Sequence, residues 1–336
     1  MKYHCSIHDI VKISSNFPFP GYEVGEVSDP DIVVEIRKDL NFSKDGLSKL
    51  DFWFYGREGE EFVYFEDNLF GVKNKVLLKC LEGKTEIYAT KSVLKIDRLY
   101  APRSRGSLYD LINTVIRIKL IQKGCLNIHA SCLAKNDSAI LFAAFPNVGK
   151  TLTTLQLLKE GFKYISDDTV LVDRNGNAYL TSFPSAIGYE DFLKFIKPAD
   201  IGTWRYYRAL IKGWIIKKSN ILHRIMQPPL ICLGDIFETV DKSKVDVVCT
   251  LEIGERRIEE VDKEYMVERI TAINDYSLSR INNPFIFVYS YFNNFSIAEI
   301  ERKQRENLLE FLRGCKCYSL ACNDWNWIAL VKEVIR

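Results

Sequence analysis

Short apolar runs alternate with polar turns along the first hundred residues of this 336-residue chain. Such alternation, with β-branched and aromatic residues in the runs, is typical of β-strands. The runs lie at residues 32–36, 50–55, 61–65, 76–78 and 86–89, with Gly, Asp and Asn between several of them. We therefore predict a β-rich amino-terminal domain over residues 1–103.

A different pattern follows the Pro-, Arg- and Gly-containing stretch 101–106. Ser107 is a helix-capping residue, and apolar positions then recur at helical spacing to about residue 123. Strand-like and helix-like segments alternate from there, which predicts an α/β, or mixed α+β, domain over residues 104–336. We expect strands at 127–134, 139–144, 163–166, 169–172, 245–251 and 284–291, and helices at 149–160, 296–313 and 324–334.

The segment 145–151 joins the predicted strand 139–144 to the predicted helix 149–160. Its sequence matches the phosphate-loop pattern G-x-x-x-x-G-K-[ST] except that Ala144 replaces the first glycine. Backbone N–H groups of Asn147, Val148 and Gly149 at a helix start attract phosphate oxygens. Lys150 neutralises phosphate charge, and Thr151 offers a hydroxyl to Mg²⁺. The loop therefore predicts binding of a nucleotide such as ATP with Mg²⁺.

Three further side chains add to this prediction. Asp167 and Asp168 follow a predicted strand, where carboxylates beside a phosphate loop can bind Mg²⁺ or accept a proton. His129 lies on the predicted strand that precedes the loop strand, which suits a role in orienting or catalysis. A packed core histidine and a polar turn between strands are the structural alternatives.

These motifs resemble, in order and spacing, those of the HPr serine kinase/phosphorylase family over about residues 107–185. That family has a P-loop core related to ATP-type phosphoenolpyruvate carboxykinase, so the resemblance implies this core behind the β-rich domain. It implies transfer of the γ-phosphoryl group to a hydroxyl, commonly of serine, on a protein, peptide or small molecule. Asp167 would be the general base, Thr151 and Asp168 the metal ligands, and His129 would tune Asp167. The resemblance also allows the reverse assignment, with Asp168 as the general base and Asp167 as the metal ligand.

The chain also departs from the family pattern. Ala144 replaces the opening glycine, and the downstream arginine has only Arg269 and Arg280 as nearby candidates. A non-catalytic, nucleotide-gated binding protein on a kinase-like scaffold is therefore one alternative. A P-loop GTPase is another, although the chain lacks N-K-x-D and matches D-x-x-G only at Asp173–Gly176, on a predicted hairpin turn.

Composition changes this picture little. Lys and Arg number 46 against 44 Asp and Glu, so nothing points to nucleic acid as a partner. The segment 197–226 is an exception, with seven basic residues, one acidic residue and interleaved aromatics. It predicts an amphipathic helical insertion with a solvated basic face, or one that docks an acidic partner, a membrane surface or the phosphoryl acceptor.

The sequence also bears on location. No amino-terminal signal sequence and no apolar run fit for a membrane helix are found, and the nine cysteines are scattered. We therefore expect a cytoplasmic protein with reduced thiols. The sequence leaves open whether the chain forms a homo-oligomer.

Overall fold

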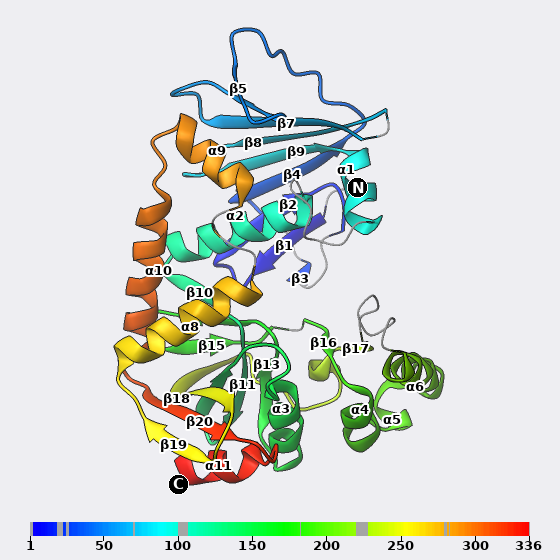
Figure 1. Cartoon of the computed structure of the whole chain (residues 1–336), viewed down its shortest axis with the longest axis vertical. Helices are drawn as coiled ribbons and strands as arrows, with labels where there is room; N and C mark the ends of the chain where they lie inside the picture. The colour runs from blue at the N-terminus through cyan, green and yellow to red at the C-terminus, as the bar shows by residue number, and fades with distance from the viewer. Residues whose placement is uncertain are drawn as a thin grey trace. The chain divides into compact units, whose positions relative to one another are not determined.

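The computed structural model describes residues 3–18, 23–24, 27–69, 71–99, 107–181, 183–219, 228–278, 281 and 283–335. The chain has a mixed α/β architecture with two compact units, each containing a large sheet (Figure 1). Unit 1 comprises Met1–Leu126 and Leu278–Asn307, and unit 2 comprises Asn127–Ser277 and Leu308–Arg336. This division differs from the single boundary predicted at residue 103, because two segments beyond that boundary pack with the amino-terminal sheet.

Unit 1 is built on a nine-stranded sheet in the described part of the chain. The strands have the order β3-β1-β2-β4-β9-β8-β7-β6-β5. Four of the predicted runs fall on these strands, and the run at 50–55 divides into two strands around a turn. The strands are β1 (Tyr3–Ile7), β2 (Val11–Ser15), β3 (Glu23–Val24), β4 (Ile32–Arg37), β5 (Ser48–Leu50), β6 (Phe54–Gly56), β7 (Phe62–Leu69), β8 (Val72–Lys79) and β9 (Thr85–Thr90).

The helices of unit 1 are α1 (Lys91–Leu99), α2 (Leu108–Gln122), α9 (Pro284–Phe292) and most of α10 (Ile297–Leu312). The strand predicted at 284–291 is wrong, because this segment forms α9. Asn283 caps the helix by accepting a hydrogen bond from Phe285 N at 3.0 Å, and Pro284 occupies the first turn, where proline is favoured. Phe285 packs against Phe54 and Phe65, with ring centroids 5.2 and 5.4 Å apart.

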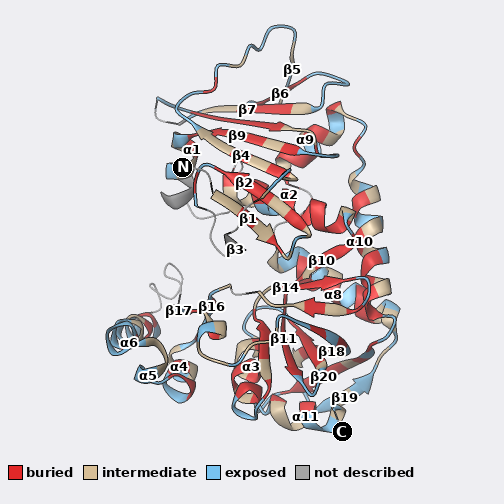
Figure 2. Ribbon diagram, turned by 180° about the vertical axis from the view of Figure 1, so that it is seen from behind, coloured by how far each residue is buried: buried red, intermediate tan, exposed pale blue. Residues whose placement is uncertain are grey.

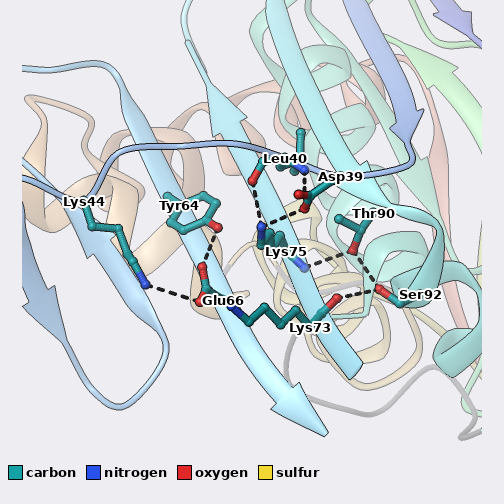
Figure 3. A network of polar contacts seen from close by, with 9 residues as sticks. All are labelled: Asp39, Leu40, Lys44, Tyr64, Glu66, Lys73, Lys75, Thr90 and Ser92. Atoms are coloured by element: carbon teal, nitrogen blue, oxygen red, sulfur yellow. Dashed lines mark hydrogen bonds and ion pairs between the residues drawn. The ribbon is translucent and has the colours of Figure 1, made fainter. Parts of the chain in front are cut away.

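Charged side chains of unit 1 are held by structural contacts (Figure 3). Lys75 on β8 donates to Asp39 Oδ1 at 2.7 Å and to the carbonyl of Leu40 at 2.9 Å. The Tyr64 hydroxyl donates to Glu66 at 2.7 Å on β7. The two contacts of Lys75 tie the loop after β4 to the middle of the sheet, and they pair the buried lysine charge as burial requires.

Unit 2 carries the predicted phosphate loop on a second sheet, of the order β10-β14-β15-β18-β12-β11-β13, with β20 beside β18 and β19 beside β20. The chain enters this unit within β10. The strands are β10 (Cys125–Ile128), β11 (Ala130–Lys135), β12 (Ser138–Ala143), β13 (Lys163–Ser166), β14 (Val170–Asp173), β15 (Asn177–Tyr179), β18 (Lys242–Ile253), β19 (Arg257–Glu260) and β20 (Lys316–Cys322). A short pair, β16 (Ser185–Ala186) and β17 (Leu230–Ile231), stands apart from this sheet.

Unit 2 also contains helices, and strands β11 and β20 of its sheet are largely buried (Figure 2). The helices are α3 (Lys150–Lys159), α4 (Tyr189–Phe195), α5 (Pro198–Ile201), α6 (Thr203–Lys218), α8 (Lys263–Ser277), α11 (Trp327–Val334) and the 3₁₀ helix η1 (Leu233–Asp235). Within the described residues, no helix has both the length and the apolar character needed to cross a bilayer.

The strand registers bring three chain positions to one edge of the sheet. β11 runs antiparallel to β12 and β13, with Ala130 opposite Ala143 and Cys132 opposite Ser166. The start of β11 therefore lies beside the ends of β12 and β13. The single strand predicted at 127–134 is broken at His129, which separates β10 from β11. His129 thus stands next to the residues that follow β12 and β13.

Candidate functional site

The predicted phosphate loop lies between the end of β12 and the start of α3. Gly149, the residue before the helix, has φ of 114°, and Asn147 has φ of 65°. The left-handed backbone at Gly149 favours glycine. Ala144 is buried and is not among the described residues with positive φ, so alanine can occupy this position without backbone strain.

The first turn of α3 has no side-chain cap and no acidic residue. Instead, the hydroxyls of Thr153 and Thr154 bond to the carbonyls of Gly149 and Lys150, at 2.9 and 3.0 Å. The N–H groups at the helix start therefore have no capping side chain. A helix start of this kind attracts anions, because its N–H groups and the helix dipole both favour negative charge.

Lys150 is buried at the base of the loop. Its Nζ lies 2.9 Å from His129 Nε2 and donates to the carbonyl of Ala144 at 3.0 Å. Burial lowers the pKa of Lys150, while the nearby carboxylates of Asp168 and Asp167 oppose this shift. The structure therefore brings the predicted lysine, histidine and both aspartates close together.

His129 is held in place through its main chain. Its N–H donates to Asn274 Oδ1 at 2.8 Å, and Asn274 Nδ2 donates to the carbonyl of Asn127 at 3.3 Å. Burial, together with the charge of Lys150, lowers the pKa of His129 to about 4. The imidazole is therefore neutral at pH 7, and Nε2 can accept a hydrogen bond from the lysine. Asn274 lies on α8, which the sequence reasoning did not predict.

Asp167 follows β13 and is completely buried. Its Oδ2 accepts a hydrogen bond from Thr151 Oγ1 at 3.1 Å, so the carboxylate reaches the first turn of α3. Burial and the charge of Asp168 raise the pKa of Asp167 to about 6, against the effects of Ser185, Lys150 and Thr151. Ser185 lies near Asp167, but neither Asp167 Oδ1 nor Ser185 Oγ makes a hydrogen bond with another described residue.

Asp168 differs from its neighbour in both exposure and backbone. It is only half-buried, and its φ of 69° places it in the left-handed region. Neither aspartate is part of β13, which ends at Ser166, so the pair follows the strand as predicted. A hydrogen bond to the backbone of Asp168 favours the protonated form of His129 and links the two residues.

Aromatic side chains that the sequence reasoning did not single out lie beside the loop. A Cβ atom on Gly149 would meet Trp327 Nε1 at 2.5 Å and Trp325 Cε3 at 3.3 Å. Exposed Phe145, at the start of the loop, packs edge-on against Tyr276 with ring centroids 5.3 Å apart. The dense Trp-Asn-Trp stretch at 325–327 was the available signal in the sequence.

Two other sequence features lie apart from these contacts. The Arg269 guanidinium bonds to the Tyr265 hydroxyl at 2.6 Å and pairs with Glu252 at 3.4 Å. Arg280 falls outside the described residues. In the D-x-x-G match, the Asp173 carboxylate accepts hydrogen bonds from Asn177 and Tyr179, which closes the predicted hairpin turn.

Comparisons with known proteins add little to this geometry. No protein-family model and no curated protein matches the chain. Among solved structures, it is similar to the HPr(Ser) kinase/phosphatase from Coxiella burnetii, with 11% sequence identity and a TM-score of 0.27. The match covers 62% of this chain and 88% of that chain. A likeness this weak carries no argument about activity.

Proposed function

We propose that this chain is an ATP-dependent kinase that transfers the γ-phosphoryl group to a hydroxyl-bearing acceptor. The observation that carries the proposal is the hydrogen bond of 3.1 Å between Thr151 of the phosphate loop and the buried carboxylate of Asp167. It joins a phosphate-binding feature to a titratable group with a perturbed pKa. This combination is typical of phosphoryl-transfer sites.

The loop supplies binding of the nucleotide. The uncapped start of α3 and the backbone of Asn147, Val148 and Gly149 would receive phosphate oxygens. Lys150 would turn its ammonium from the Ala144 carbonyl toward the β- and γ-phosphates. Because the neutral His129 ring accepts a hydrogen bond, it can keep one N–H of that ammonium while another reaches the phosphate.

Asp167 supplies the base. Its pKa of about 6 lies near neutral pH, where a general base works best. In the proposed step, the acceptor hydroxyl oxygen bonds to the γ-phosphorus, and the bond from that phosphorus to the β–γ bridging oxygen breaks. Asp167 takes the hydroxyl proton, and ADP leaves with the bridging oxygen.

The donor groups suit Mg²⁺, which prefers oxygen ligands and usually takes one or two carboxylates with phosphate oxygens and water. Thr151 and Asp168 would hold the ion, next to the unpartnered Oδ1 of Asp167. When bound, Mg²⁺ neutralises phosphate charge. Among the described residues, no cluster of three His, Cys, Asp or Glu side chains forms a metal site by itself. The nucleotide would therefore complete the coordination.

Trapping the acceptor tests the proposal. The protein would be incubated with γ-labelled ATP, Mg²⁺ and cell extract, and the labelled molecule identified, with Lys150→Ala as the inactive control. Transfer of label to one acceptor, lost in that variant, is the expected result. Nucleotide binding without any transfer would instead indicate a nucleotide-gated binding protein. Absence of nucleotide binding would remove both functions.

A further inference from the structure

The helix α6 carries an apolar stripe on its exposed side. Trp204, Tyr207, Ile211 and Trp214 follow one another at spacings of three and four residues, so they lie on one face of the helix. Trp204 is 79% exposed, Ile211 58% and Trp214 49%. We call these four residues the α6 stripe. The sequence predicted a solvated basic face or a docking surface here, and the exposed side of the helix carries this stripe as well as the exposed Arg205 and Arg208.

The opposite face of α6 is fixed to the rest of the unit. Tyr206 packs on Phe192 of α4, with ring centroids 5.1 Å apart. Gly213 allows Tyr189 to come close, since a Cβ atom there would lie 3.3 Å from the tyrosine ring. Figure 1 shows α4, α5 and α6 grouped together near β16 and β17, with α3 between them and the sheet, and Figure 2 shows much of α6 exposed. The α6 stripe is therefore the outward side of a helix whose inner side is already packed.

Basic residues run along one flank of the stripe. Arg205, Arg208 and Lys212 are also spaced by three and four residues, which places them in a row beside it. None of the three makes an ion pair with a described carboxylate, whereas Lys217 pairs with Glu190 at 2.5 Å. The positive charge beside the stripe is thus uncompensated within the described part of the chain.

We infer that α6 docks onto an anionic lipid bilayer, lying in the plane of its surface. A helix with tryptophans and aliphatic residues on one side and Lys or Arg beside them is typical of interfacial helices. Tryptophan and tyrosine favour the headgroup region, because their rings have an apolar body and a polar group. The stripe stands on the outer side of a single helix, which suits a broad surface better than an extended peptide. The uncompensated charges complement anionic headgroups.

Sedimentation with lipid vesicles tests this inference. The full chain would be mixed with phosphatidylcholine vesicles that contain about one-third phosphatidylserine, or none. We expect binding only to the anionic vesicles, weakened by added salt and accompanied by a blue shift of tryptophan fluorescence. Trp204→Ala/Trp214→Ala should weaken binding roughly tenfold or more. Arg205→Gln/Arg208→Gln/Lys212→Gln should weaken it about a hundredfold, since each basic residue near the surface contributes about fivefold.

Matched control variants distinguish binding through α6 from nonspecific binding of the chain to vesicles. Phe52→Ala removes an exposed aromatic ring of unit 1, and Arg256→Gln/Arg313→Gln/Lys316→Gln removes three exposed charges of unit 2 away from α6. Both should bind as the unaltered chain does. Failure to bind anionic vesicles, or binding that the α6 variants leave unchanged, overturns the inference. Binding to polyglutamate without binding to vesicles would also overturn the inference, and it would assign α6 to an acidic protein partner. Circular dichroism would verify that the variants fold.

Discussion

Lys150 and His129 meet at their side-chain tips, with Nζ of the lysine 2.9 Å from Nε2 of the imidazole. Because burial and the lysine charge lower the pKa of His129 to about 4, the ring is neutral and accepts from the ammonium. The carbonyl of Ala144 holds a second N–H. A bound phosphate would therefore replace one of these two acceptors, and the ammonium group would stay paired with the other.

Lys150→Ala should weaken the binding of Mg·ATP about tenfold or more, since a hydrogen bond to a charged group contributes ~1.5–3 kcal/mol. Isothermal titration would measure the dissociation constant. Lys159→Ala is the matched control, because it removes an exposed lysine from the last turn of the same helix and should leave affinity unchanged. Equal affinities for both variants would contradict the phosphate-loop assignment.

Asp167→Asn should lower turnover by ~10²–10⁴-fold and leave nucleotide affinity close to that of the unaltered chain, because asparagine keeps the shape but cannot accept the proton. Since burial raises the pKa of Asp167 to about 6, activity of the unaltered chain should fall as the pH drops below that value. The measurement is the rate of label transfer to the trapped acceptor across this range.

Asp168→Asn is the comparison for this prediction. If Asp168 binds the metal, its variant should raise the Mg²⁺ concentration needed for half-maximal rate, whereas Asp167→Asn should not. The opposite pattern would exchange the roles of the two aspartates.

Asp167→Asn should also stabilise the fold at neutral pH. The pKa of Asp167 is raised from 3.8 to about 6, so the folded state must bury a charge once the pH rises above about 6. By linkage, this lowers the free energy of unfolding by up to about 3 kcal/mol at neutral pH, and the penalty disappears as the pH falls toward 4. Urea unfolding should show Asp167→Asn more stable than the unaltered chain near pH 7, with little difference near pH 4. A variant that is no more stable at neutral pH would argue against a buried charge.

Gly149→Ala should destabilise the loop for two separable reasons. A left-handed residue other than glycine costs about 1–2 kcal/mol, and the new methyl group would press on the buried ring of Trp327, which adds about 1–3 kcal/mol. In a Trp327→Leu background only the first cost should remain. Chemical denaturation of the four proteins in this cycle gives the coupling, which should reach at least about 1 kcal/mol. The same cost in both backgrounds would show that the ring yields freely.

The local order of the site was accessible to sequence reasoning. The apolar run 139–144, the G-K-T sequence and the glycine at 161 predicted β12, the loop and α3 closely. Asn136 and Asp137 tolerate positive φ, and both adopt it in the turn between β11 and β12. Hydrophobic periodicity and turn chemistry act over a few residues, so one sequence can reveal them.

Long-range contacts were not accessible in this way. Asn274 reaches His129 from a helix 145 residues away, and Trp327 packs at Gly149 from the carboxyl-terminal part of the chain. Such contacts depend on how the strands are ordered in the sheet rather than on local pattern. The run 284–291 shows a second limit of sequence patterns, namely that a short run of aromatic and β-branched residues fits a strand as well as a helix. Only the helix cap at Asn283 distinguishes the two.

The return of residues Leu278–Asn307 to unit 1 has a consequence for biosynthesis. A ribosome releases the amino terminus first, and domains usually fold as they emerge. Phe54 and Phe65 pack on Phe285, which is synthesised more than two hundred residues later, so this part of the core cannot be complete before then. Unit 1 therefore cannot finish folding until most of the chain has been translated, and a fragment that stops after its sheet would expose those aromatic rings to water.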